Sequence, residues 1–270
     1  MQTNFTQIDD PSSRVAVISG STGGIGFSIC LKLATNGMKI VMLGRDAAKL
    51  QRARTKLSEH LGVESPVWIQ VIDIRDPASV ERGVAEIYKL TPQVDFLVHA
   101  AGDGPVASLL ATTEAMWTET VQAKLLGTIR LTKAIAQHMV NAGGGHVVIV
   151  NGVFSLEPDP MFSINSTVNC GLSGFAKASA RDLGRSGVRV NVVNPGATQT
   201  SLWNDIAQAL AEQFHTSVED IDAQVRAKIP LGKLATTDDI AEVVAFLASP
   251  AANYLNGTSI TVDGGVTAAL

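Results

Sequence analysis

The fold of this chain is decided by residues 14–37, RVAVISGSTGGIGFSICLKLATNG. The first six residues form an apolar, β-branched run typical of a buried strand, and the segment after the glycines has the spacing of an amphipathic helix. Glycines between the two let the backbone turn sharply, let a phosphate approach and let the helix pack on its strand, while the helix N-terminus supplies N–H donors. The stretch therefore predicts a dinucleotide-binding turn. Its candidate cofactor-binding residues are Gly20, Ser21, Thr22, Gly24, Ile25 and Gly26.

The same alternation of short apolar runs and longer helical patterns continues along the chain. Near-continuous apolar strands separated by helices are typical of a parallel sheet with helices on both faces. We therefore predict one α/β domain of the doubly wound Rossmann type over residues 14–265, after a tail of residues 1–13. Residues 112–139 are expected to form one long helix, and residues 201–229 a helical insertion near the ligand. The seven predicted strands are residues 14–19, 39–43, 67–73, 95–99, 146–150, 188–194 and 259–263.

Composition excludes several classes of protein. A net charge of −4 with scattered Lys and Arg gives no basic footprint for nucleic acid. No apolar run reaches the roughly 18 residues of a membrane span, and the N-terminus lacks the pattern of a signal peptide. Cys30 and Cys170 are expected to be buried thiols, and no histidine has metal-site spacing, so we predict a cytoplasmic protein without a metal.

The end of the second predicted strand bears on the choice of cofactor. An NAD enzyme places an acidic residue there to bind the ribose 2′-hydroxyl. Here Gly44 leaves room for a 2′-phosphate, and Arg45 offers planar donors that match one. We therefore predict NADP(H). The competing interpretation is that Arg45 is a solvated residue before the next helix and that Asp46 caps that helix.

Further motifs follow the other strands in a fixed order: Asp73, then Ala101-Gly102, then Pro195-Gly196 with Thr200, and finally Val262-Asp263-Gly264-Gly265. Together with the GxxxGxG turn, the chain resembles the short-chain dehydrogenase/reductase superfamily over residues 14–265. The resemblance implies a small-molecule substrate and a homotetramer or homodimer. It also implies that the cofactor is held at adenine by Asp73 and Ile74, at the adenosine ribose by Ala101 and Gly102, and at nicotinamide by Pro195, Gly196, Thr198 and Thr200.

The chain departs from that family where the family's chemistry resides. Family members use a Ser, a Tyr, a Lys four residues after the Tyr, and a helical Asn; the tyrosine gives the product alkoxide its proton. The aligned residues here are Gly152, Asn165, Asn169 and Lys124, in that order. Neither of the two tyrosines has a Lys four residues later. We assign Asn165 and Gly152 to the substrate, and Asn169 and Lys124 to the cofactor.

One interpretation is hydride transfer to an iminium carbon, because that reaction needs no proton donor. It does need an anion beside the cation, and the loop Glu157-Pro158-Asp159-Pro160-Met161-Phe162 offers one. Asp159 is the candidate catalytic carboxylate. The competing interpretation is a surface turn in which Asp159 only accepts a hydrogen bond from the backbone.

This loop and a cation at position 124 are together similar to a small fungal group of NADPH-dependent reductases that also act as Diels–Alderases in making bicyclic diazaoctane indole alkaloids. The resemblance implies that Asp159 and Lys124 are catalytic, and that an aromatic residue at the position of Phe162 covers the substrate. Trp203 in the insertion is a further candidate for lining the pocket. The predicted substrate-binding residues are Gly152, Pro158, Asp159, Pro160, Phe162, Asn165 and Trp203.

Two alternatives stay open. In the first, the protein reduces a carbonyl and Lys124 or a bound water replaces the tyrosine as acid. The competing interpretation of Lys124 is a cation on the helix surface that makes an i,i+4 pair. In the second, the protein is a non-catalytic NADP-binding protein that has kept the fold and lost the chemistry.

Overall fold

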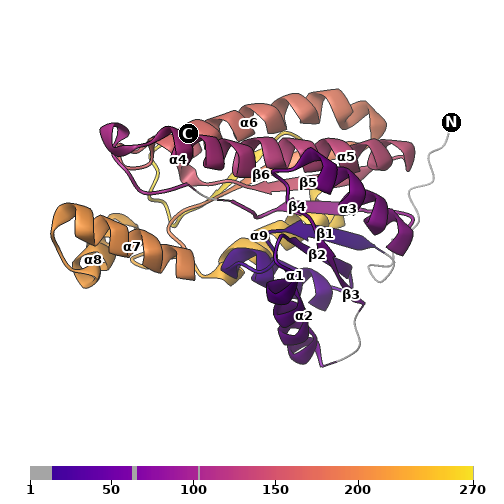
Figure 1. Cartoon of the computed structure of the whole chain (residues 1–270), viewed down its shortest axis with the longest axis horizontal. Helices are drawn as coiled ribbons and strands as arrows, with labels where there is room; N and C mark the ends of the chain where they lie inside the picture. The colour runs from indigo at the N-terminus through magenta and orange to yellow at the C-terminus, as the bar shows by residue number, and fades with distance from the viewer. Residues whose placement is uncertain (1–13, 63–65, 103, 270) are drawn as a thin grey trace.

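The computed structural model describes residues 14–62, 66–102 and 104–269, so the predicted tail of residues 1–13 lies outside it. A seven-stranded sheet runs through the described part of the chain in the order β3-β2-β1-β4-β5-β6-β7 (Figure 1). All neighbouring strands are parallel. The predicted doubly wound sheet is therefore confirmed. Its strands are β1 (Val15–Ser19), β2 (Lys39–Gly44), β3 (Val67–Val71), β4 (Phe96–His99), β5 (Gly145–Val150), β6 (Val188–Pro195) and β7 (Ser259–Val262).

Helices cover both faces of the sheet, and each face has its own core. Alternate residues of β1 supply both cores, because successive strand side chains point to opposite faces: Ile18 belongs to one and Val17 to the other. One core lies under α1 (Gly24–Thr35), α2 (Ala47–Leu61) and α9 (Thr237–Ala248). The other lies under α3 (Pro77–Leu90), α5 (Gly127–Asn141) and α6 (Ser163–Leu183), on the opposite side of the sheet in Figure 1.

The strand order reverses between β1 and β4. From this pair the chain builds one half of the sheet through β2 and β3, and the other through β5 to β7. The two strands end side by side, where Ala100 N donates to Ser19 O at 3.0 Å. In open parallel sheets a ligand binds in the crevice beyond the carboxyl ends of the strands at such a reversal. The fold therefore places the glycine turn after β1 at this crevice.

The long helix predicted over residues 112–139 is present as one uninterrupted helical run over residues 114–141, but it is not a regular α-helix throughout. The structure has α4 (Glu114–Thr120), a π-helix over Val121–Leu126, and then α5. A π-helix accommodates an extra residue in the turn and is frequent at functional sites. Apolar periodicity does not reveal one inserted residue, because the pattern on either side remains helical. Lys124 lies within the π-helix.

Residues 201–229 contain two helices, α7 (Ser201–Phe214) and α8 (Val218–Lys228). They project from the body of the sheet and its covering helices (orange in Figure 1). A small apolar cluster of Ala207, Ala211 and Ile221 joins them. Because this cluster is separate from the two main cores, the helix pair has little apolar burial of its own.

Two sequence-based statements concern burial. Cys30 is buried as expected, but Cys170 is exposed on α6, because it faces outward from a helix whose opposite side packs on the sheet. Within residues 14–62, 66–102 and 104–269, no helix is long and apolar enough to cross a membrane.

Candidate functional site

The glycine turn is shaped by close backbone contacts. Gly20 has φ +71°, and a Cβ at this residue would lie 2.3 Å from Ala100 O. A Cβ at Gly26 would lie 2.2 Å from Gly20 O. The buried Ser21 hydroxyl donates to Leu43 O at 3.1 Å, which ties the turn to β2. No side chain caps the N-terminus of α1 at Gly23. The turn is thus a narrow cradle that only glycine permits.

A cavity of about 600 Å³, which we call the large cavity, opens at the crevice beyond the ends of β1, β2 and β4. Seven of the predicted cofactor residues line it, whereas Ser21, Gly24 and Gly26 lie in the cradle behind it. The seven are Gly20, Thr22, Arg45, Asp73, Ile74, Ala101 and Gly102.

Arg45 lies at the wall of the large cavity, directly after β2. Asp46 caps α2, its carboxylate accepting from Lys49 N at 2.9 Å, as the competing interpretation expected. Arg45 is exposed, lies outside that cap and lines the cavity together with Gly44. The residue thus combines solvent access with a position at the ligand crevice.

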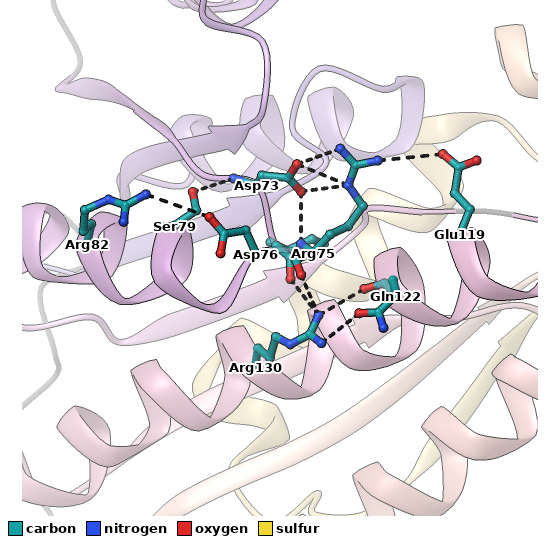
Figure 2. A network of polar contacts seen from close by, with 9 residues as sticks. Asp73, Arg75, Asp76, Ser79, Arg82, Glu119, Gln122 and Arg130 are labelled. Carbon is teal, nitrogen blue, oxygen red and sulfur yellow. Dashed lines mark hydrogen bonds and ion pairs between the residues drawn. The ribbon is translucent and has the colours of Figure 1, made fainter. Parts of the chain in front are cut away.

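A network of charged groups forms the floor of the large cavity near β3 (Figure 2). The Arg75 guanidinium donates to both oxygens of the Asp73 carboxylate, with distances from 2.7 to 3.2 Å. The Arg75 hydrogen bonds hold the pKa of Asp73 below its ordinary value. Glu119 lies 3.9 Å from Arg75 on the other side. Asp73 therefore stays ionised while its charge is already compensated.

Arg130 of α5 extends this network to the π-helix. Its guanidinium donates to Arg75 O at 3.0 Å and to the Gln122 side chain at 2.8 Å. Sequence analysis missed both Arg75 and Arg130. Arg75 was detectable, because it lies two residues after Asp73 at a strand end; nothing in the sequence brings Arg130 to the same loop.

A second cavity of about 210 Å³, the inner cavity, adjoins the large one and shares Ala100 and Gly102 with it. Residues predicted for the nicotinamide end line its wall, together with Ile25, Asn169 and Lys124. Three aromatic side chains, Phe154, Phe162 and Trp203, supply much of the remainder. The nicotinamide-end residues are Pro195, Gly196, Thr198 and Thr200.

Lys124 is 4% exposed, so its interpretation as a surface cation is wrong. Its ammonium donates to Asn151 O at 3.4 Å. Among the described residues that line the inner cavity, Lys124 is the only one with a titratable side chain. The π-helix thus directs a cation into a largely apolar chamber.

Of the other three positions that depart from the family pattern, Gly152 and Asn169 line the inner cavity together with Lys124. Gly152 has φ +152°, and a Cβ there would lie 2.9 Å from the Asn169 amide nitrogen. Asn165 is buried but does not line the inner cavity; its amide donates to Gly104 O at 3.2 Å. The buried Oδ1 atoms of Asn151 and Asn169 accept no hydrogen bond from the described residues. Buried acceptors of this kind favour a ligand or water beside them.

Neither tyrosine reaches the two cavities. Tyr88 stacks on His138 with ring centroids 3.8 Å apart, and burial raises its pKa. Tyr254 is fully exposed. His99 bonds Thr132 Oγ1 at 2.8 Å, and burial lowers the pKa of this imidazole to about 3, so it stays neutral. No phenol or imidazolium therefore faces the inner cavity from the described residues.

The proline loop brings its aromatic residue, and not its carboxylate, to the cavity. Asp159 Oδ1 accepts from Met161 N at 2.7 Å. Asp159, Pro158 and Pro160 do not line the inner cavity. Phe162 does, stacked on Phe154 with centroids 4.3 Å apart. In this conformation Asp159 closes the turn that places Phe162.

Trp203 is held in place from α8. Its indole N–H donates to Asp222 Oδ1 at 2.9 Å, and Asp222 Oδ2 accepts from Arg226 Nε at 2.7 Å. The Arg226 hydrogen bond keeps the pKa of Asp222 below its ordinary value. Sequence analysis singled out Trp203 but not its two partners. Over the part of the chain that the structure describes, no group of His, Cys, Asp and Glu is arranged to hold a metal ion.

Comparison with known proteins gives matches over nearly the whole chain. A family model described as enoyl-(acyl carrier protein) reductase matches residues 20–267. Dehydrogenase/reductase SDR family member 4 of Homo sapiens is 30% identical over 98% of this chain and 92% of its own length. The 3-oxoacyl-(acyl-carrier-protein) reductase FabG of Escherichia coli is 29% identical over 94% and 97% of the two chains.

Solved structures agree with these matches. An actinorhodin polyketide ketoreductase variant with NADPH superposes with a TM-score of 0.90 at 27% identity, covering 95% of this chain and 98% of that one. The L-sorbose reductase of Gluconobacter frateurii, complexed with NADPH and L-sorbose, gives a TM-score of 0.88 at 27% identity, with coverage of 96% and 98%.

Proposed function

The chain belongs to the short-chain dehydrogenase/reductase superfamily, and from this membership we propose that it is an NADPH-dependent reductase that transfers hydride to an iminium carbon of a bulky, apolar substrate. An oxidoreductase of this superfamily acts on a small molecule with a nicotinamide cofactor. The observation that carries the finer proposal is the inner cavity, which has three aromatic walls and no tyrosine among its described lining residues.

The residues present fit a nicotinamide dinucleotide. A Cβ at Gly20 or Gly26 would collide with backbone atoms of the chain itself, so the turn packs closely and brings the N-terminus of α1 to the cavity, where its N–H groups suit a pyrophosphate. The buried Oδ1 of Asn169 needs a donor at the inner cavity. When bound, NADPH supplies the hydride. In this proposal Arg45 binds the 2′-phosphate, Asp73 and Ile74 border the adenine, and Thr198 and Thr200 border the nicotinamide.

An iminium acceptor fits the inner cavity in its aromatic lining and in its lack of a tyrosine among the described lining residues. The charge there is opposed to it, because Lys124 is a cation and no carboxylate is among those lining residues. Hydride addition to a ketone leaves an alkoxide that must gain a proton, whereas addition to an iminium carbon moves the C=N electron pair to nitrogen and gives a neutral amine directly. No proton donor is then required. The faces of Phe154, Phe162 and Trp203 attract a cation and shield it from water. These residues also orient a product for the cycloaddition that the fungal resemblance implies, which we include in the proposal.

Carbonyl reduction is the second candidate, and the burial of Lys124 favours it. An ammonium inside the inner cavity stabilises a developing alkoxide and offers it a proton. Asn169 and Asn151 lie beside it and orient the substrate oxygen or a water. Both candidates use the same cofactor and the same cavity, and they differ in whether the acceptor needs Lys124.

The deciding experiment combines binding and turnover. The protein is titrated with NADPH and NADH, and NADPH absorbance is then followed in stopped flow with an N-methyl dihydroisoquinolinium salt and with benzophenone. We expect tighter binding of NADPH and oxidation by the iminium salt alone. Oxidation by benzophenone alone would establish the carbonyl candidate. A protein that binds neither nucleotide would be the non-catalytic alternative.

Two substitutions of Asp159 separate its charge from its turn. Asparagine accepts the same backbone hydrogen bond in such turns, whereas alanine cannot. We expect Asp159→Asn to keep turnover within about threefold of wild type. Asp159→Ala should lower turnover about tenfold, because Phe162 is then no longer held in place. A tenfold loss corresponds to a rise of about 1.4 kcal/mol in the activation free energy. Steady-state kinetics and NADPH titration measure both. If Asp159→Asn alone loses tenfold with unchanged NADPH affinity, the carboxylate acts on the substrate.

A further inference from the structure

The inner cavity is too small for the whole of a bulky substrate. Its volume is about 210 Å³, and its walls include the residues that border the nicotinamide ring. Sites that hold drug-sized ligands usually measure about 300–1,000 Å³. A bulky substrate therefore places only its reacting ring in the inner cavity and extends beyond it.

A third cavity of about 540 Å³, the outer cavity, adjoins the inner one. It is formed by α7, α8 and the segment that follows β6. Trp203 and Thr200 line both the inner and the outer cavity, so the indole lies at the boundary between them. The outer cavity is mixed in character: Ala207, Val218 and Leu234 give it an apolar side, and Glu219 and Arg226 a polar side.

The backbone and the indole of Trp203 are held by different groups. The backbone N–H donates to Thr200 Oγ1 at 3.1 Å in the cap of α7, and the indole N–H donates to Asp222 Oδ1 at 2.9 Å. Asp222 is in turn held by Arg226 one helical turn later at 2.7 Å. Asp222 lines the outer cavity but not the inner one, so it reaches the inner cavity only through Trp203.

We propose that Trp203 divides the substrate site into two chambers and that Asp222 is the positioning residue that sets this division. The reacting C=N group occupies the inner cavity, and a second ring system occupies the outer cavity. The substrate class is therefore a two-part molecule: a small cyclic iminium joined to a second ring. This inference rests on the proposed function for its substrate, but its geometry does not depend on turnover.

The kinetic test compares two iminium salts, N-methyl dihydroisoquinolinium and its benzyl derivative, in wild type, Asp222→Leu and Asp222→Asn. Leucine removes both hydrogen bonds, whereas asparagine keeps an acceptor for the indole. We expect Asp222→Leu to lower the ratio of kcat/KM for the benzyl salt over the parent salt about tenfold. Asp222→Asn should restore most of it. The matched control is Asp205→Asn on the exposed side of α7, which should leave the ratio unchanged.

A second measurement keeps the inference separate from the proposed function. The protein is labelled with fluorotryptophan and loaded with NADP+, so that no hydride can be transferred. The Trp203 resonance is assigned with Trp203→Phe, and fluorine NMR follows titration with the benzyl salt. We expect Trp203 to shift on titration, and to broaden in Asp222→Leu. If wild type turns over neither salt but Trp203 shifts, the proposed function fails and the division stands. The division would be overturned if Asp222→Leu lowered kcat/KM equally for both salts. It would also be overturned if the Trp203 resonance did not shift on titration with the benzyl salt.

Discussion

NADPH is expected to bind Arg45→Asp about 100-fold more weakly than wild type, while the affinity for NADH changes by less than about threefold. Each tenfold in affinity corresponds to about 1.4 kcal/mol of binding free energy. Arg45 lines the large cavity directly after β2, next to Gly44. Its guanidinium is suited to bidentate contact with the 2′-phosphate, and such charge-assisted bonds contribute about 1.5–3 kcal/mol each. The new carboxylate would also repel the phosphate, whereas NADH has only a hydroxyl there.

The control for this variant is Arg52→Asp, the same charge reversal at an exposed residue of α2. Equilibrium titration by cofactor fluorescence measures the affinities of wild type and both variants for NADPH and NADH. An equal loss of affinity for NADPH and NADH would mean that Arg45 maintains the shape of the cavity and does not bind the 2′-phosphate. Unchanged affinities would remove Arg45 from the cofactor site.

Lys124→Met is expected to separate the two candidate reactions. Methionine keeps most of the side-chain length and removes the ammonium. Because a general acid contributes about 10²–10⁴-fold, any reduction of a ketone should fall by about 100-fold or more. Reduction of the iminium salt should change by less than about threefold, since hydride addition alone completes it.

Stopped-flow oxidation of NADPH with each acceptor measures this difference, and NADPH titration separates it from a loss of cofactor binding. Lys133→Met on the exposed face of α5 is the matched control. Equal losses for both acceptors together with weaker NADPH binding would assign Lys124 to holding the cofactor. A large loss with the iminium salt at unchanged NADPH affinity would contradict the proton-free mechanism.

The sequence was sufficient for the architecture because the architecture depends on local patterns. Apolar strands such as β1 alternate with amphipathic helices, and the glycine turn can adopt only one close-packed shape. The choice of NADPH at Arg45 stays a prediction, and it rests on the end of one strand alone. These features follow from residues that are neighbours in the chain.

The details of the candidate site depended on contacts that sequence patterns do not record. The burial of Lys124 follows from a π-helix inside an otherwise regular helical pattern. The orientation of Asp159 follows from a hydrogen bond to Met161 N, which competes with any role toward the cavity. Asp222 meets Trp203 across two helices, 19 residues away in the chain. In each case the side chain could have made other contacts that are equally compatible with the sequence, and only the folded structure shows which contact it makes.

Arg130 has a thermodynamic consequence for the site. Its guanidinium connects the loop after β3 with Gln122, two residues from Lys124. Any nucleotide contact that displaces the loop after β3 must therefore break the Arg130 hydrogen bonds or move the segment that carries Lys124 with it. The free energy of binding at the adenine end thus includes a term from the packing of that segment.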